Sequence, residues 1–145
     1  MIEIEKNIVG KEFLEMAFER CIKCSTCKYG YKNYERSCPS GEHFLFESYW
    51  ASGRIRTIRG LLLGDLEWSK DLIDPIFACT TCGACSDSCQ APHADYIVDM
   101  IEALRELAVQ HVGPANNQEL LVSRCIEHCN PYGEENSTNE DLKTK

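Results

Sequence analysis

Eight of the ten cysteines fall into two runs with the same pattern, in which three thiols at a spacing of three are followed by a fourth. The first run comprises Cys21, Cys24, Cys27 and Cys38, and the second comprises Cys79, Cys82, Cys85 and Cys89. The N-terminal stretch MIEIEKNIVGKEF has charges throughout and lacks the apolar run of a secretory signal. Thiols this dense in an intracellular chain are typical of metal ligands rather than disulfides.

Three kinds of thiol chemistry could explain the two cysteine runs: disulfide bonds, structural zinc and iron–sulfur clusters. A disulfide framework suits secreted proteins and fits poorly here. Structural zinc takes its ligands in separated pairs, so a third cysteine at the same spacing fits zinc poorly. A cubane iron–sulfur cluster is wide enough for one loop to wrap it with three thiolates, while the fourth thiolate comes from elsewhere in the chain. The runs therefore favour two 4Fe–4S clusters, with structural zinc as the alternative.

The fourth ligand of each cluster is expected to come from the opposite run. In the bacterial ferredoxin pattern Cys-x2-Cys-x2-Cys-x3-Cys-Pro, the last cysteine serves the other cluster. The expected ligand sets are Cys21, Cys24, Cys27 and Cys89 for cluster one, and Cys79, Cys82, Cys85 and Cys38 for cluster two. Crossed ligation would tie the two runs together and bring the clusters near one another, as electron relay requires.

Apolar residues recur at helical spacing around both runs, and no segment shows sustained strand alternation. The clearest predicted helices cover residues 11–20 and 94–110. Ser40 and Ser69 are candidate N-caps of shorter helical segments, and Gly64 suits a C-terminal cap. We therefore predict a mainly α fold in which two cluster-binding loops lie between helices.

Prolines mark the expected ends of several of these helices. Pro39 directly follows the first run and can begin a helix, whereas Pro75 is expected to break one. Gln90 replaces the proline that would follow the second run, so Pro92 is expected to begin the next helix instead. Pro114 is expected to begin the last helix.

Charge and hydropathy narrow the possible partners. The formal net charge is −8, and two clusters with their thiolates would make it more negative, so nucleic-acid binding is excluded. No segment approaches the length of a membrane span, and we expect a cytoplasmic protein. The basic residues near the first run and on the following helix either offset cluster charge, contact an acidic partner or form a solvated face: Lys23, Lys28, Lys32, Arg36, Arg54, Arg56 and Arg59.

The motifs CIKCSTCKYGYKNYERSCP and CTTCGACSDSC, on a helical scaffold, resemble those of the α-helical ferredoxins. They are most similar to the C-type iron–sulfur component of heterodisulfide reductase, over about residues 10–133 of this chain. The resemblance implies two clusters that pass electrons from a flavin-bearing subunit to a partner with cysteine-rich CCG domains. The segment NPYGEENS, residues 130–137, is similar to one that joins such domains in fused relatives, which implies CCG domains on a separate subunit.

No flavin fingerprint, nucleotide loop or acid–base set accompanies the cysteines. The expected function is therefore that of an electron-transfer subunit in a heterodisulfide-reductase-like oxidoreductase, with no catalytic residues of its own. One alternative is the same role in another anaerobic dehydrogenase or acyl-CoA reductase complex. A structural zinc-binding adaptor without a redox role is the other.

The remaining metal-ligand types fit no complete site. Cys125 and Cys129 are spaced for one face of a helix, either as half of a third metal site or as small apolar residues packed on the core. We predict that they are not ligands within this chain, because a site needs about four ligands. The four histidines are expected to be surface or capping residues: His43, His93, His111 and His128. The predicted domains are residues 1–133, the helical ferredoxin, and residues 134–145, a polar and flexible tail.

Overall fold

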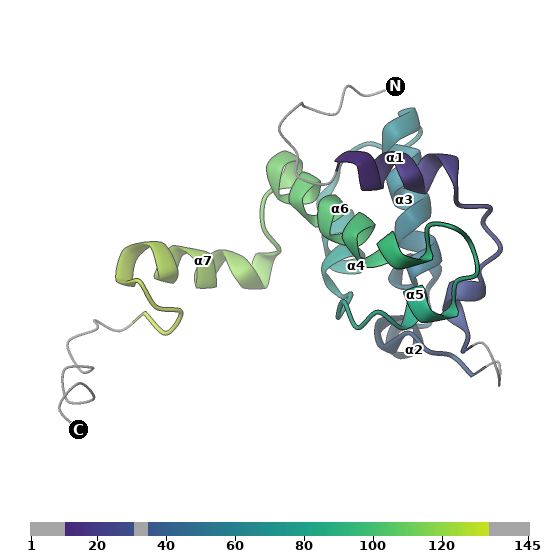
Figure 1. Cartoon of the computed structure of the whole chain (residues 1–145). Helices are drawn as coiled ribbons and strands as arrows, with labels where there is room; N and C mark the ends of the chain where they lie inside the picture. Colours follow the sequence, from purple (N-terminus) through teal and green to yellow (C-terminus); the bar gives the residue numbers. More distant parts are fainter. Residues whose placement is uncertain (1–10, 31–34, 134–145) are drawn as a thin grey trace. The chain divides into compact units, whose positions relative to one another are not determined.

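The computed structural model describes residues 11–30 and 35–133, which form two compact units divided between Gly113 and Pro114. The predicted tail, residues 134–145, and Lys32 lie outside the described residues. The first unit contains the α-helices α1 (Lys11–Glu19), α2 (Pro39–Phe44), α3 (Ala51–Leu63), α4 (Ile73–Phe77), α5 (Ala84–Ser88) and α6 (Ile97–Val112) (Figure 1). Between them lie the 3-10 helices η1 (Thr26–Lys28), η2 (Glu47–Tyr49), η3 (Lys70–Leu72) and η4 (Ala94–Tyr96). The second unit contains α7 (Asn116–His128).

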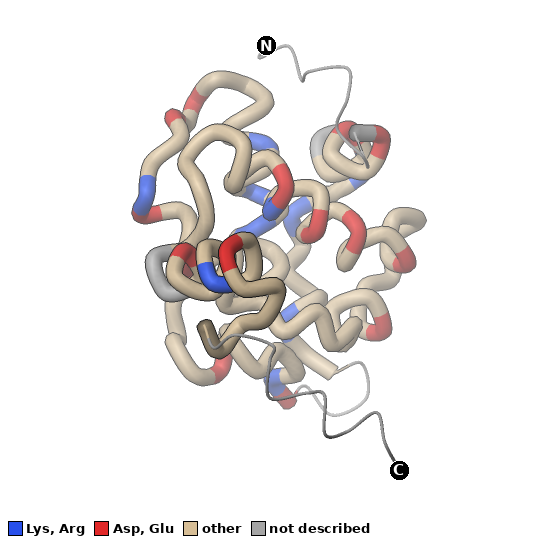
Figure 2. The backbone as a smooth tube through the Cα atoms, turned by 90° about the vertical axis from the view of Figure 1, so that its left-hand side faces the viewer, with Lys and Arg blue, Asp and Glu red and all other residues tan. Residues whose placement is uncertain are grey.

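The prediction of a mainly α fold is confirmed. Among the described residues, β pairing is limited to one isolated bridge between Tyr29 and Arg36. Asp and Glu residues are scattered over many elements rather than gathered in one segment (Figure 2). None of the described helices is long and apolar enough to cross a bilayer.

The core lies where α1, α3 and α6 meet (Figure 1). The apolar residues at helical spacing in α6 form one buried stripe, because residues three and four apart fall on one helix face: Ile97, Met100, Ile101, Leu104, Leu107 and Ala108. Leu14 and Ala17 of α1 and Ile55 and Ile58 of α3 complete this core. The three helices thereby form a rigid base from which the cysteine-bearing loops extend.

Two predicted helix ends are confirmed, and one predicted cap is wrong. Pro39 is the first residue of α2, and Gly64 ends α3 with a φ of 78°. The N-cap of α2 is Cys38 rather than Ser40, because the residue before a proline favours the extended conformation and the helix therefore begins at Pro39. Ser69 precedes η3, but its side chain makes no capping hydrogen bond.

Three predictions about prolines are also wrong. Pro114 does not begin the last helix, because α7 begins at Asn116. Pro75 does not break its helix, because it is the third residue of α4, where a backbone N–H has no partner within the helix in any case. Pro92 does not begin a helix. It lies in a turn closed by a hydrogen bond of 2.9 Å from the N–H of Ala94 to the carbonyl of Ala91, and α6 begins only at Ile97.

Candidate metal centres

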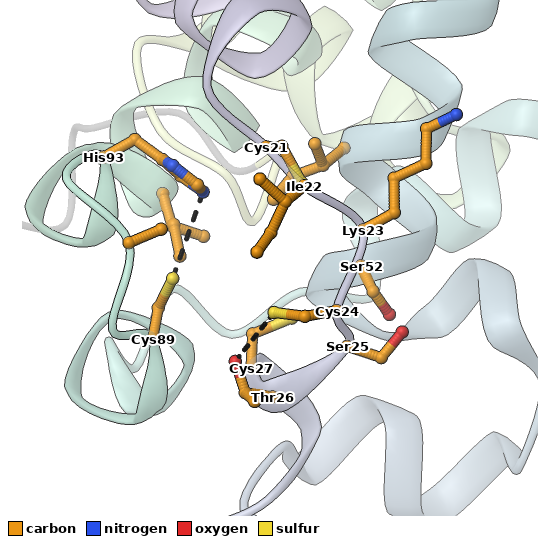
Figure 3. Close-up of a pocket in the computed structure, with 13 residues that line it drawn as sticks. Cys21, Ile22, Lys23, Cys24, Ser25, Thr26, Cys27, Ser52, Cys89 and His93 are labelled. Carbon is orange, nitrogen blue, oxygen red and sulfur yellow. Dashed lines mark hydrogen bonds between the residues drawn. The ribbon is translucent and has the colours of Figure 1, made fainter.

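The four thiols predicted to bind cluster one surround a pocket, here called pocket one, which begins just after the end of α1 in the chain. Its cysteines are Cys21, Cys24, Cys27 and Cys89. Three of them come from the loop between α1 and α2, and the fourth follows α5. Figure 3 shows the thiol of Cys89 facing that of Cys24 across the pocket. Ile55 of α3 and Ile97 of α6 form part of the wall.

A charged contact holds the part of the α1–α2 loop around Cys27 against the scaffold. The ammonium group of Lys28 in η1 pairs with the carboxylate of Glu47 in η2. The same carboxylate accepts a hydrogen bond of 2.8 Å from the hydroxyl of Ser52 in α3. Hydrogen bonds from Lys28 and Ser52 lower the pKa of Glu47, although its partial burial opposes them. The loop around Cys27 is thereby held against α3.

The four thiols predicted to bind cluster two surround a second pocket, here called pocket two. Its cysteines are Cys38, Cys79, Cys82 and Cys85. Cys38 caps α2, and the others lie in the loop before α5 and in α5 itself. Arg105 of α6 holds this loop by donating hydrogen bonds of 3.4 Å to the carbonyls of Ile76 and Phe77, and a further one to the carbonyl of Cys79.

Each pocket thus brings together three thiols of one run and the fourth thiol of the other. These groups have the same members as the two predicted ligand sets. Iron binding by these thiols stays a prediction. No group of three His, Cys, Asp or Glu side chains within residues 11–30 and 35–133 could hold a metal ion. A cubane spreads its four thiolates over four different irons, and so needs a wider ring of thiols than a single ion does.

The same two helices, α3 and α6, contribute residues to the walls of both pockets. In α3, Ile55 lines pocket one and the adjacent Arg54 lines pocket two. In α6, Ile97 lines pocket one and the adjacent Val98 lines pocket two. Adjacent residues of one helix point in different directions, so the same two helices can face both pockets. The pockets are therefore neighbours on one base.

The backbone repeats its conformation at matching positions of the two runs. The residue before the second cysteine has a positive φ in both, at Lys23 and Thr81, and so does the residue after it, at Ser25 and Gly83. Left-handed residues turn successive backbone N–H groups toward one side, which creates a concave site for an anion. The N–H of Thr81 already donates a hydrogen bond of 3.4 Å to the sulfur of Cys79. The loops are therefore suited to an anionic cluster with thiolate ligands.

Comparison with known proteins agrees with this geometry. The protein family described as a 4Fe-4S dicluster domain matches residues 17–92, more than half of the chain. This chain belongs to the 4Fe-4S dicluster domain family. The matched region contains all eight cysteines of the two pockets, and membership supports 4Fe–4S clusters and an iron–sulfur electron-transfer role.

Two known proteins are similar to this dicluster domain chain over most of its length. Lactate utilization protein B of Lysinibacillus sphaericus is 29% identical over 121 residues, which are 82% of this chain and 22% of that protein. The D-type component of the dihydromethanophenazine:CoB–CoM heterodisulfide reductase of Methanosarcina barkeri is 25% identical over 138 residues, which are 88% of this chain and 32% of that protein. The chain therefore spans less than a third of the length of each. No solved structure matches it significantly.

The thiols at the centre of the dicluster domain resist ionisation while no metal is bound. Burial raises the pKa of Cys27 to about 12, and the neighbouring thiols of Cys85 and Cys89 contribute to this rise. Burial likewise raises the pKa of Cys85 to about 11, with help from Cys79 and Cys38. Since metals bind the thiolate form, cluster assembly at these residues must release protons.

These pKa shifts predict how the metal-free chain responds to alkali. The folded chain keeps the protons of Cys27 and Cys85 to a higher pH than the unfolded chain, in which a thiol has its ordinary value of 9.0. Stability is therefore greatest below about pH 9 and falls as the pH rises toward about 12. Urea unfolding of the metal-free, reduced chain between about pH 8 and about pH 11 should show this loss. The loss should be smaller in Cys27→Ala, and an equal loss in that variant would contradict the assignment.

The sequence predicts His93 to be a surface or capping residue. It is 2% exposed and lines pocket one, and although it precedes η4, its side chain makes no capping hydrogen bond. Its Nε2 atom lies 3.9 Å from the sulfur of Cys89, and its buried Nδ1 atom has no hydrogen-bond partner (Figure 3). Burial lowers the pKa of its imidazole, and the nearby Arg20 lowers it further. The cysteine spacing gave no sign of this residue, because the turn at Pro92 brings it inward.

Cys125 and Cys129 belong to the second unit. Both thiols are exposed, so the alternative that they pack as apolar core residues is wrong. Cys125 lies in α7, but Cys129 ends that helix with a φ of 56°, because the chain turns there into the hydrogen-bonded NPYG segment. The N–H of Cys129 donates a hydrogen bond of 3.0 Å to the carbonyl of Cys125, so Cys129 lies one turn beyond Cys125 but, unlike the prediction, outside the helix.

We expect the double variant Cys125→Ala, Cys129→Ala to leave metal binding by the dicluster domain unchanged, since neither thiol lines a pocket. Iron and zinc should be measured in the isolated chain and in any complex that co-purifies with it. Loss of one metal from either sample would show that these thiols are ligands.

Proposed function

We propose that this dicluster domain is an electron-transfer subunit with one 4Fe–4S cluster in each pocket. Pocket one would hold its cluster through Cys21, Cys24, Cys27 and Cys89, and pocket two through Cys79, Cys82, Cys85 and Cys38. The observation that carries the proposal is that each pocket is lined by three thiols of one run and the fourth thiol of the other. When bound, each cluster would accept and release one electron.

The residues around the thiols suit this role. Ile55 and Ile97 at pocket one and Ile101 at pocket two are almost completely buried, and they exclude water from the walls. Cys27 of pocket one and Cys85 of pocket two are both buried and close enough for one thiol to affect the pKa of the other. Neighbouring sites in a dry interior favour transfer of an electron between them.

The chain's expected place is in a cytoplasmic, heterodisulfide-reductase-like oxidoreductase, where it supplies no catalytic residues of its own. Its proposed partners are a flavin-bearing donor subunit and a subunit with CCG domains. The similarity to the heterodisulfide reductase component of Methanosarcina barkeri supports this assignment. A dicluster domain alone has redox centres but no substrate site, so the reaction would take place on a partner.

A second candidate is the same role in another anaerobic dehydrogenase or acyl-CoA reductase complex. The similarity to lactate utilization protein B favours it, since that name refers to lactate rather than to a heterodisulfide. The two candidates share the dicluster domain and differ only in the partners. Identifying the subunits that co-purify with the chain distinguishes them.

Anaerobic purification of the chain tests the proposed function. We expect a brown protein with about eight irons and about eight acid-labile sulfides per chain, and EPR signals of 4Fe–4S clusters after reduction. A colourless protein that contains zinc would instead identify a structural adaptor without a redox role.

A further inference from the structure

Arg54 of α3 is a buried cation that donates its hydrogen bonds to neutral groups. Its side chain is 1% exposed. Its guanidinium donates hydrogen bonds of 2.7 Å to the carbonyls of Tyr49 and Pro75 and of 3.0 Å to the hydroxyl of Ser40. The ion pairs found in the described part of the chain include none with Arg54. Burying a charge without a counter-ion is costly, so an anion near the guanidinium would stabilise it.

Pocket two is the place where that anion would lie. Arg54 lines this pocket together with its four cysteines. The hydroxyl of Ser40, which accepts from Arg54, lies 3.5 Å from the sulfur of Cys38. The carbonyl of Tyr49 also accepts from both Arg54 and the thiol of Cys38, the latter at 3.7 Å. A single polar atom therefore separates the guanidinium from a predicted ligand.

No buried Lys or Arg is among the described residues that line pocket one, although the buried imidazole of His93 lines it. Among the described residues that line it, the only Lys or Arg is Lys23. Lys23 is exposed, and Figure 3 shows its ammonium group directed away from the pocket. A charge in water is strongly screened, whereas the same charge in the interior acts with a much lower effective dielectric constant. The two pockets therefore differ in the charge that their walls supply.

Hydrogen bonds to sulfur occur at both pockets and do not by themselves distinguish them. In pocket one, the hydroxyl of Thr26 lies 3.1 Å from the sulfur of Cys24, and Nε2 of His93 lies 3.9 Å from the sulfur of Cys89. In pocket two, the N–H groups of Gly41 and Thr81 each donate a hydrogen bond of 3.4 Å, to the sulfurs of Cys38 and Cys79 respectively. Hydrogen bonds to ligand sulfurs and nearby positive charge both stabilise the reduced, more negative state of a cluster. The buried positive charge of Arg54 is therefore the effect that favours an electron at pocket two.

We propose that Arg54 is the resident counter-ion of the cluster in pocket two, and that its charge makes this cluster the more easily reduced of the two. The inference rests on the proposed function, because it requires a cluster in each pocket. One electron from a one-electron reductant would therefore come to rest at pocket two, with no bond made or broken. Within the chain, the favoured direction of transfer is from pocket one to pocket two.

Potentiometric EPR titration of the anaerobically reconstituted chain tests the assignment. In the wild-type chain, the cluster in pocket two should be reduced first. Arg54→Gln should shift the electron distribution toward pocket one by at least about tenfold, which corresponds to about 59 mV for a one-electron couple. Arg54→Lys keeps the positive charge and should give a smaller shift. The variants Cys89→Ser and Cys38→Ser, each expected to keep one cluster, assign the signals.

Arg56→Gln is the matched control, because Arg56 lies on the same helix but is half-exposed and pairs with Glu47. This variant should leave both potentials unchanged.

Earlier reduction of pocket one in the wild-type chain would overturn the inference, even if Arg54→Gln failed to fold. An equal shift of both clusters, or no shift, in Arg54→Gln would also overturn it. A wild-type chain that binds no iron would overturn the proposed function as well, whereas about eight irons with the wrong order of reduction would overturn only the role of Arg54.

Discussion

Replacing Cys89 by Ser is expected to remove the cluster of pocket one, although this residue lies far in the sequence from the other three thiols of that pocket. Iron content should fall from about eight to about four per chain, because a cubane left with three thiolates loses one of its four anchors. The EPR signal of the cluster in pocket two should remain. The substitution changes one atom beside pocket one and leaves every thiol of pocket two in place.

Cys38→Ser should give the reciprocal result, with loss of the cluster in pocket two and retention of the other. Cys125→Ser is the matched control, because it removes a thiol of the same chain that lines neither pocket. Its iron content and EPR spectrum should equal those of the unsubstituted chain. If Cys89→Ser instead removed the cluster of its own run, the crossed assignment would be wrong.

Replacing Gly53 by Ala is expected to have the largest effect on folding. A Cβ atom at Gly53 would overlap the carbonyl group of Glu47, and it would lie 2.6 Å from the carbonyl carbon of Glu47 and 2.9 Å from the Cα of Ser48. These are backbone atoms of η2, so relief requires α3 and η2 to move apart. We expect a loss of about 3 kcal/mol or more in the free energy of unfolding, measured by urea denaturation of the reconstituted chain.

The same movement should disturb pocket two. The carbonyl of Tyr49 in η2 accepts hydrogen bonds from Arg54, Ser40 and Cys38, so a shift of η2 moves the support of a predicted ligand. Thr57→Ala is the control, since it also introduces Ala into α3 but at a partly exposed position with good helix propensity. Equal stability of the two variants would show that the close contact at Gly53 has no consequence.

The thiol pattern and the main helices were predictable from the sequence because both are local features. Spacing of three within one loop is read directly from the chain, and the stripe on α6 repeats at the helical period. The pairing of each run with the last cysteine of the other came from the analogy with ferredoxins, and the pockets bring together the same residues.

From the sequence, Arg54 is one of several basic residues that could offset cluster charge, but the burial of Arg54 and of His93 was beyond sequence reasoning, because each depends on packing between distant segments. An arginine on a helix usually faces water, but the approach of α2, η2 and α4 buries Arg54. The repeated left-handed residues were equally hidden. Gly83 is a residue that favours a positive φ, but Lys23 and Thr81 carry no such signal.

Diffraction at the iron absorption edge from crystals of the anaerobically purified chain would test the central claim most directly. The account predicts two groups of four irons, one surrounded by Cys21, Cys24, Cys27 and Cys89 and the other by Cys38, Cys79, Cys82 and Cys85. A single group, isolated ions, or two groups each bound only by the cysteines of its own run would contradict it.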